Sequence, residues 1–123
     1  MSDGADVLDM SVVDVLMRIK KQGFFPNLVN VFTEDSQRLI NLIGTSIDET
    51  NGRGLEESSH ALKSASASIG AHLVAELAFE LEKLGESGTT EGAAEIVPNL
   101  VGRLEAARVE LARLAAEKEA ASS

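Results

Sequence analysis

Residues 55–84 read LEESSHALKSASASIGAHLVAELAFELEKL, and this stretch decides the fold. Its apolar residues recur every three or four positions, which is the spacing of a helix face turned toward a core. Gly70 interrupts the pattern, and glycine readily adopts the left-handed conformation that ends many helices. The stretch therefore predicts two helices, one ending near Ile69 and the next beginning after Gly70. In this interpretation Gly70 has a structural role, because it separates the two helices.

Helical spacing of apolar residues predicts three more helices around this pair. The first runs from Asp6 toward Gly23, and the second covers about residues 25–49. Asn51 is the expected N-cap of the helix that follows. The last helix is either kinked at Pro98 or begins near Val97, because proline disrupts a helix interior. The apolar stripes of these three helices contain Leu8, Val12, Val15, Leu16, Ile19, Leu28, Val31, Phe32, Leu39, Leu42, Ile43, Ile47, Val97, Leu100, Val101, Leu104, Leu111 and Leu114.

No window alternates apolar and polar residues as a strand would, so the sequence predicts an all-α protein. Four amphipathic helices joined by short loops bury their stripes most simply as an antiparallel four-helix bundle, with an additional N-terminal helix packed on it. We expect a flexible leader at residues 1–5, a single domain at 6–116 and a frayed tail at 117–123.

Composition excludes several classes of function. The 123 residues contain no Cys, so disulfides and thiolate metal sites are absent, and the formal net charge of −9 disfavours nucleic acid and anionic membranes as partners. No apolar run approaches the ~20 residues of a membrane span, and no signal-peptide pattern is present. His60 and His72 are too far apart for a helical metal pair. We expect a cytoplasmic protein with no bound metal.

His60 is the one residue whose surroundings suggest chemistry. At about 100° per residue, Leu55, Leu62 and Ile69 lie roughly opposite it on the helix, so its imidazole should face solvent. Lys63, Ser64 and Ala67 lie within about 60° of it on the same wheel. Small neighbours leave room for a second protein, and Lys63 could neutralise an anionic group on the ring. The plainer interpretation is a surface histidine without a role.

The same residues resemble the signature of histidine-containing phosphotransfer (HPt) domains. The resemblance rests on His60-Ala-Leu62-Lys63, the small-residue run to Ser68, Ile69-Gly70-Ala71, and the later Leu81-Glu82. The long helix from Phe24 to Leu42 is also similar to the helix that precedes the family motif. Ser64 departs from the usual Gly, and Ser59 stands where Ala is common.

The resemblance implies a phosphoryl carrier of two-component phosphorelays that has no ATP site of its own. His60 would accept a phosphoryl group from a receiver-domain phospho-aspartate and pass it to another receiver, with Lys63 stabilising charge. The chain itself would bind no cofactor, and Mg²⁺ would come from the receiver. The expected docking surface consists of Glu56, Ser59, Lys63, Ser64, Ala67 and Phe79.

Several alternatives remain open at this level. Phe79 either packs against the last helix or forms an exposed contact for a receiver, while Glu76, Glu80 and Glu82 are interpreted as solvated or edge-of-core charges. The chain as a whole could instead be a helical interaction module without phosphotransfer, or a fragment of a kinase dimerisation domain. We expect a monomer, although the long last helix could support a dimer.

Overall fold

The computed structural model describes residues 7–122, and the leader expected at residues 1–5 lies outside this range. The described chain is helical and contains no strand. Its helices are α2 (Met10–Met17), α3 (Phe24–Asp48), α4 (Gly52–Ser68), α5 (His72–Glu86) and α6 (Ala93–Ser122). None of them is long and apolar enough to cross a membrane. The predicted all-α class is therefore confirmed.

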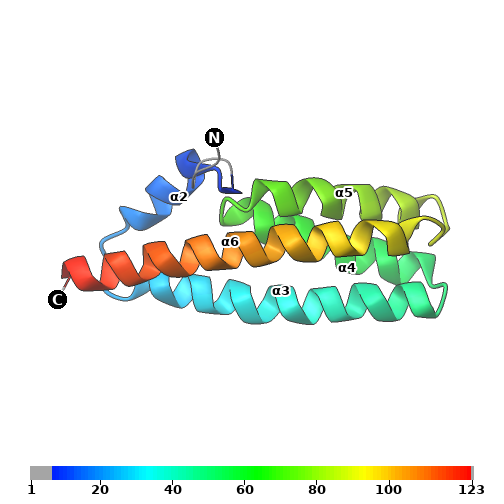
Figure 1. Cartoon of the computed structure of the whole chain (residues 1–123), viewed down its shortest axis with the longest axis horizontal. Helices are drawn as coiled ribbons and strands as arrows, with labels where there is room; N and C mark the ends of the chain where they lie inside the picture. Colours follow the sequence, from blue (N-terminus) through cyan, green and yellow to red (C-terminus); the bar gives the residue numbers. More distant parts are fainter. Residues whose placement is uncertain (1–6, 123) are drawn as a thin grey trace.

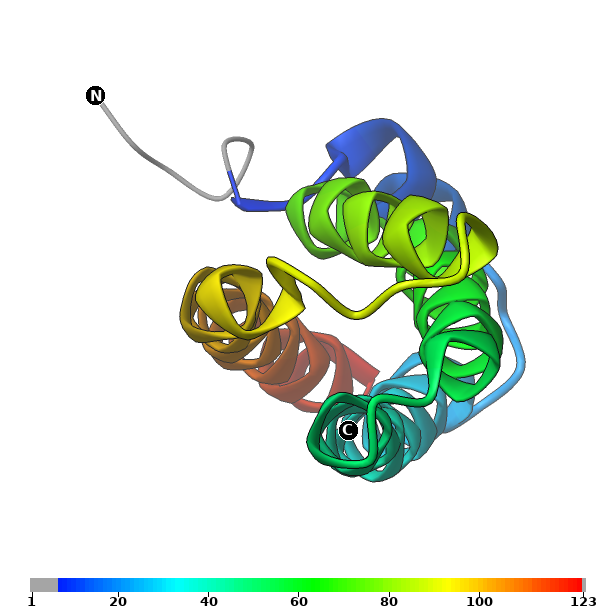
Figure 2. The same ribbon diagram turned by 90° about the vertical axis from the view of Figure 1, so that its right-hand side faces the viewer.

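Helices α3, α4, α5 and α6 run side by side in alternating directions (Figure 1). Seen along the bundle, they surround a common core, and α2 lies across the end of the bundle beside α5 (Figure 2). The Asp9 amide donates a 2.7 Å hydrogen bond to the Gly70 carbonyl, which ties the start of α2 to the α4–α5 turn. This is the predicted four-helix bundle with an additional N-terminal helix.

The ends of the helices follow from local chemistry. The Asn51 side chain accepts a 2.9 Å hydrogen bond from the Gly54 amide, which confirms the predicted N-cap of α4. Gly70 has a φ of 85°, the left-handed conformation expected at this turn. Helix α2 covers only Met10–Met17 and is shorter than predicted; Asp9 caps its start by accepting a hydrogen bond from the Ser11 amide.

The core contains apolar side chains from every helix, among them Val13, Phe25, Leu55, Leu81 and Leu111. Five residues that the sequence pattern assigned to the apolar stripes are instead exposed: Val15, Ile19, Val31, Leu42 and Val101. A helix in a bundle contacts its neighbours over a limited arc, so residues at the margin of an apolar stripe can remain in solvent. The periodicity identified the helices but overestimated the width of their buried faces.

Helix α6 differs from prediction at both ends. It begins at Ala93, so Pro98 lies within it and the alternative start near Val97 is wrong. The tail expected to fray is helical to Ser122. Two features account for this: Ala, Glu and Lys are strong helix formers, and Arg113 pairs with both Glu110 and Glu117 one turn away in either direction.

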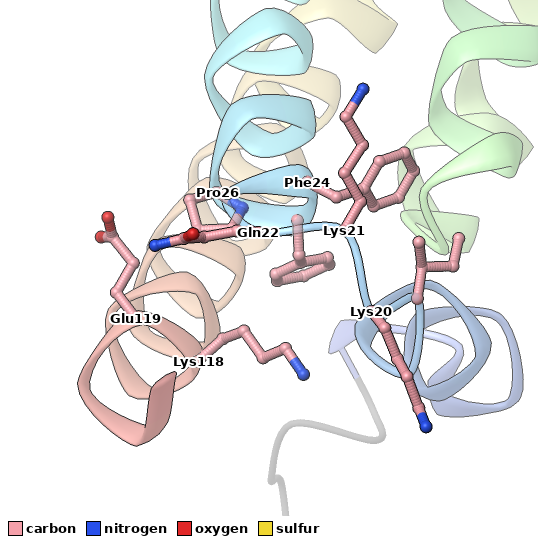
Figure 3. A pocket seen from close by; sticks show the side chains of 10 residues that line it. Lys20, Lys21, Gln22, Phe24, Pro26, Lys118 and Glu119 are labelled. Atoms are coloured by element: carbon pink, nitrogen blue, oxygen red, sulfur yellow. The ribbon is translucent and has the colours of Figure 1, made fainter. Parts of the chain in front are cut away.

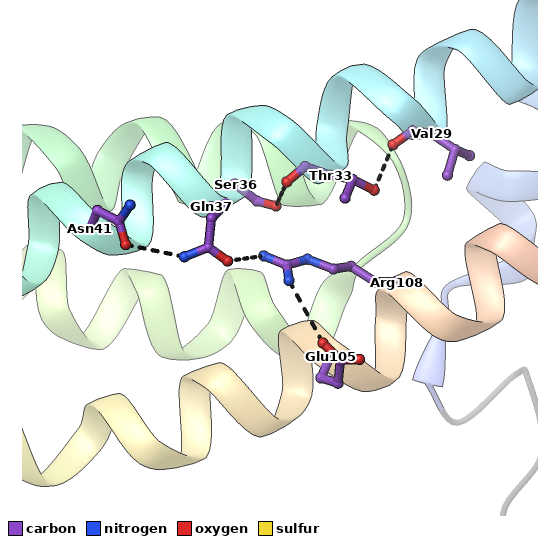
Figure 4. Close-up of polar contacts among 7 residues, drawn as sticks. All are labelled: Val29, Thr33, Ser36, Gln37, Asn41, Glu105 and Arg108. Carbon is purple, nitrogen blue, oxygen red and sulfur yellow. Dashed lines mark hydrogen bonds and ion pairs between the residues drawn. The ribbon is translucent and has the colours of Figure 1, made fainter.

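The end of α6 lies near the start of α3. Lys118 and Glu119 line a pocket of about 360 Å³ together with residues 19–26 (Figure 3). Farther along the two helices, Arg108 donates to Gln37 at 3.1 Å, and Gln37 in turn donates to Asn41 at 3.1 Å (Figure 4). Polar contacts at the surface therefore supplement the apolar packing of α6 on α3.

Candidate functional site

The imidazole of His60 faces solvent from the middle of α4. Its side chain is 60% exposed, whereas Leu55 and Leu62 on the same helix are fully buried and Ile69 is 2% exposed. Burial of these apolar residues places the opposite face of α4 in the core, so the His60 side chain points toward solvent. The exposure predicted from the helical wheel is confirmed.

Glu82 of α5 connects His60 to Lys63. One carboxylate oxygen, Oε2, lies 2.7 Å from His60 Nδ1, and the other, Oε1, lies 2.7 Å from Lys63 Nζ. The side chain of Glu82 is 14% exposed, whereas those of Lys63 and His60 are 30% and 60% exposed. The three side chains form one hydrogen-bonded and ion-paired group across the α4–α5 interface.

The surroundings of Glu82 keep it ionised. The Lys63 ammonium contributes most to holding the pKa of Glu82 below its ordinary value of 4.5, partial burial opposes this, and the bond to His60 adds to the lowering. A carboxylate has no proton to donate, so the hydrogen in the His60–Glu82 bond belongs to Nδ1. In neutral His60 the other ring nitrogen, Nε2, then carries a free lone pair and is the nucleophilic atom.

Sequence reasoning missed this role of Glu82, which it treated as a solvated or edge-of-core charge. The available signal was the position of Glu82 beside Leu81 in the Leu-Glu pair of the family pattern. That signal gives no spatial partner, since Glu82 is 22 residues from His60 along the chain. Only the packing of α5 on α4 brings the two side chains together.

Phe79 lies next to Lys63 at the surface of the same two helices. Its side chain is exposed, at 45%, and its ring centroid lies 4.7 Å from Lys63 Nζ and 4.6 Å from Lys83 Nζ. A shallow pocket there is lined by Lys63, His72, Ala75, Glu76 and Phe79 and contains no residue of α6. Of the two alternatives, the structure supports an exposed Phe79 beside the site, and its contact with a partner stays a prediction.

An open groove of about 810 Å³ lies on the other side of His60. Charged side chains contribute to its lining, which includes Arg53, Glu56, Glu57, His60, Glu82, Gly85 and Gly88. Gly85 allows this close approach of α5 to α4, because a Cβ atom there would lie 2.5 Å from the Glu56 amide nitrogen and the Gly52 carbonyl oxygen. His60 therefore lies between this groove and the exposed Phe79 ring.

The residues expected to form the docking surface have different environments. Ser64 and Ala67 are exposed and Glu56 lines the groove, so all three are accessible to a partner. Ser59 is fully buried, and its assignment to the docking surface is wrong. At about 100° from His60 on the helix, Ser59 turns into the bundle, where its small side chain fits between packed helices.

Within residues 7–122, no three His, Asp or Glu side chains gather in a geometry that could hold a metal ion. The chemistry available to the site is accordingly that of an exposed imidazole nucleophile, a carboxylate bonded to its second nitrogen, and an adjacent ammonium group. Such a site can accept an electrophilic, anionic group such as a phosphoryl group.

Comparison with known proteins agrees with this geometry. Residues 27–119 match the Hpt domain family, so the chain belongs to that family. Hpt domains are phosphoryl carriers of two-component phosphorelays and interact with receiver domains, and this chain is a phosphotransfer domain of that kind.

Two solved structures share the fold. The histidine-containing phosphotransfer protein B (HptB) of Pseudomonas aeruginosa PAO1 is 21% identical, with a TM-score of 0.86 over 92% of this chain and 97% of that one. A rice protein described as a histidine-containing phosphotransfer protein is 20% identical, with a TM-score of 0.83 over 98% of this chain and 89% of that one. No curated protein matches the sequence significantly.

Proposed function

We propose that His60 is the phosphoryl-accepting residue and that the donor and acceptor partners are receiver domains. One observation carries the proposal: the exposed imidazole of His60 is hydrogen-bonded through Nδ1 to a carboxylate that is itself paired with Lys63. His72, at the first position of α5, is half-buried, and its Nδ1 has no hydrogen-bond partner in the part of the chain that the structure describes.

The hydrogen bond to Glu82 keeps the proton of neutral His60 on Nδ1, so Nε2 is the nitrogen that can receive the phosphoryl group. The lone pair of Nε2 attacks the phosphorus of the receiver's phospho-aspartate, an N–P bond forms, and the acyl O–P bond breaks to release the aspartate carboxylate. The imidazole gains positive charge while Nδ1 keeps its proton. The Glu82 carboxylate, 2.7 Å from Nδ1, stabilises that charge. Transfer to a second receiver is the reverse reaction.

Lys63 acts on the phosphoryl group rather than on the ring. Charge in the transition state spreads over the equatorial phosphoryl oxygens, and an ammonium group nearby lowers its energy. Mg²⁺ held by the receiver would supply further charge neutralisation when bound there. The receiver would dock over His60, Lys63, Ser64, Ala67 and Phe79, with Glu56 at the edge of the contact.

Incubation with a phosphorylated receiver tests this proposal. We expect an acid-labile, base-stable phosphate on the wild-type protein and on His72→Gln, and none on His60→Gln. We also expect Lys63→Ala to slow transfer without changing helicity by circular dichroism. Transfer that persists in His60→Gln would refute the assignment. Absence of transfer from every receiver tried would favour a helical interaction module instead.

A further inference from the structure

Two different groups hold the ammonium of Lys63 from two directions. Glu82 Oε1 lies 2.7 Å from Nζ, and the Phe79 ring centroid lies 4.7 Å from it. The Lys63 side chain is 30% exposed, in contrast to the freely solvated state usual for lysine on a helix surface. Both contacts come from α5, so α5 fixes the position of a cation that belongs to α4.

The aromatic contact differs in kind from the ionic one. A ring attracts a cation through its quadrupole and carries no net charge, whereas a carboxylate repels an incoming phosphoryl group. The chain has a net charge of −9, so additional carboxylates around His60 would oppose the binding of an anion. An aromatic ring can hold an ammonium group near His60 without adding to that repulsion.

We propose that Phe79 is a positioning residue that acts through Lys63, and that it supports the phosphoryl-transfer step itself in addition to any contact with a receiver. This inference rests on the proposed function of His60. Phe79 keeps the ammonium beside His60 when a phosphoryl group draws Lys63 away from Glu82. The long, flexible Lys63 side chain then loses less conformational entropy when the transition state forms.

Phosphorylation of His60 by phosphoramidate tests this role separately from the docking of a receiver. Nε2 of His60 attacks the phosphorus of phosphoramidate, the N–P bond of the donor breaks and ammonia leaves, with no protein partner involved. Phe79→Leu keeps an apolar side chain and helix propensity but removes the ring. We expect Phe79→Leu to lower the rate constant for His60 phosphorylation by about 2- to 5-fold, which corresponds to the ~0.5–1 kcal/mol of an exposed cation–π contact.

A double-mutant cycle identifies Lys63 as the intermediary. In a Lys63→Met background, adding Phe79→Leu should change the rate constant by less than about 1.5-fold, because the cation that the ring holds is already gone. Phe79→Tyr keeps an aromatic ring, so His60 should be phosphorylated at the wild-type rate in this variant. Lys83→Met removes the other ammonium on the same ring and should leave the rate within about 1.5-fold of wild type, since it leaves the ion pair between Lys63 and Glu82 in place.

Three results of the kinetic experiments would overturn the inference. Phe79→Leu could react as fast as wild type, it could slow the Lys63→Met protein by the same factor, or Lys83→Met could be as slow as Lys63→Met. Failure of the proposed function is distinguishable, because the wild-type protein itself would then acquire no phosphate on His60. Ring-current shifts of the Lys63 ε-methylene protons give a separate readout. They should be present in the wild type and lost in Phe79→Leu, and their absence from the wild type would also refute the contact.

Discussion

Replacement of Gly85 by Ala should separate α5 from α4 and disturb the site at the same time. Gly85 is buried in α5, and a Cβ atom there would lie 2.5 Å from the Glu56 amide nitrogen and the Gly52 carbonyl oxygen, and 2.9 Å from the Glu56 Cα. Ordinary van der Waals separation is about 3.5 Å. These are backbone atoms that no rotamer change can move, so the helices must shift by roughly 1 Å.

The expected free-energy change combines two opposing effects. Overpacking of this kind costs about 3 kcal/mol, and the better helix propensity of Ala offsets about 1 kcal/mol of it. The net loss of about 2 kcal/mol corresponds to a decrease in Tm of about 8 °C for a domain of this size. Gly102→Ala is the matched control. A Cβ atom at this exposed glycine of α6 would have no neighbouring atom within 4 Å, so the substitution should stabilise the protein by up to about 1 kcal/mol.

Thermal unfolding followed by far-ultraviolet circular dichroism measures both variants, since the chain contains no Trp or Tyr for fluorescence. A movement of α5 also lengthens the 2.7 Å contacts from Glu82 to His60 and Lys63, so Gly85→Ala should transfer phosphate more slowly than wild type at a temperature where both are folded. A Tm for Gly85→Ala equal to or above that of Gly102→Ala would refute the packing argument.

Three further predictions concern the acid stability, the α4–α5 turn and the docking surface. Because the folded-state pKa of Glu82 lies below 4.5, its stabilising contribution is complete above that pH and is lost as the pH falls through the folded-state pKa. The destabilisation caused by Glu82→Gln, about 1 kcal/mol at pH 7, should therefore shrink in urea titrations as the pH falls below 4.5; a constant difference would contradict this. Gly70→Ala should lower stability by about 2 kcal/mol, because φ is 85° and a Cβ atom would lie 2.8 Å from Val13 Cγ2; an unchanged urea midpoint would count against it. Ala67→Arg should weaken receiver binding more than about tenfold in calorimetry with an unchanged Tm, and undiminished binding would mean that the docking surface lies elsewhere.

The site was predictable from the sequence only in part, and Ser59 and Glu82 show why. In both cases the environment of the residue depends on a neighbouring helix. A helical wheel gives the direction of a side chain around the helix axis but not the arc that another helix covers, so the sequence places Ser59 on the docking surface although it is buried. For Glu82 the sequence predicts only a solvated or edge-of-core charge, because nothing in its local sequence indicates the His60 and Lys63 side chains opposite it.

The sequence by itself determined the number and order of the helices from Asp9 onward, the turn at Gly70 and the solvent-facing position of His60. These properties follow from apolar periodicity, capping residues and backbone preferences, all of which act over a few neighbouring residues. Tertiary structure decided which charged and aromatic groups meet at the imidazole. Glu82, Phe79 and Lys63 come together because Gly85 lets α5 pack against the backbone of α4, and contacts between residues distant in the chain depend on that packing rather than on local sequence.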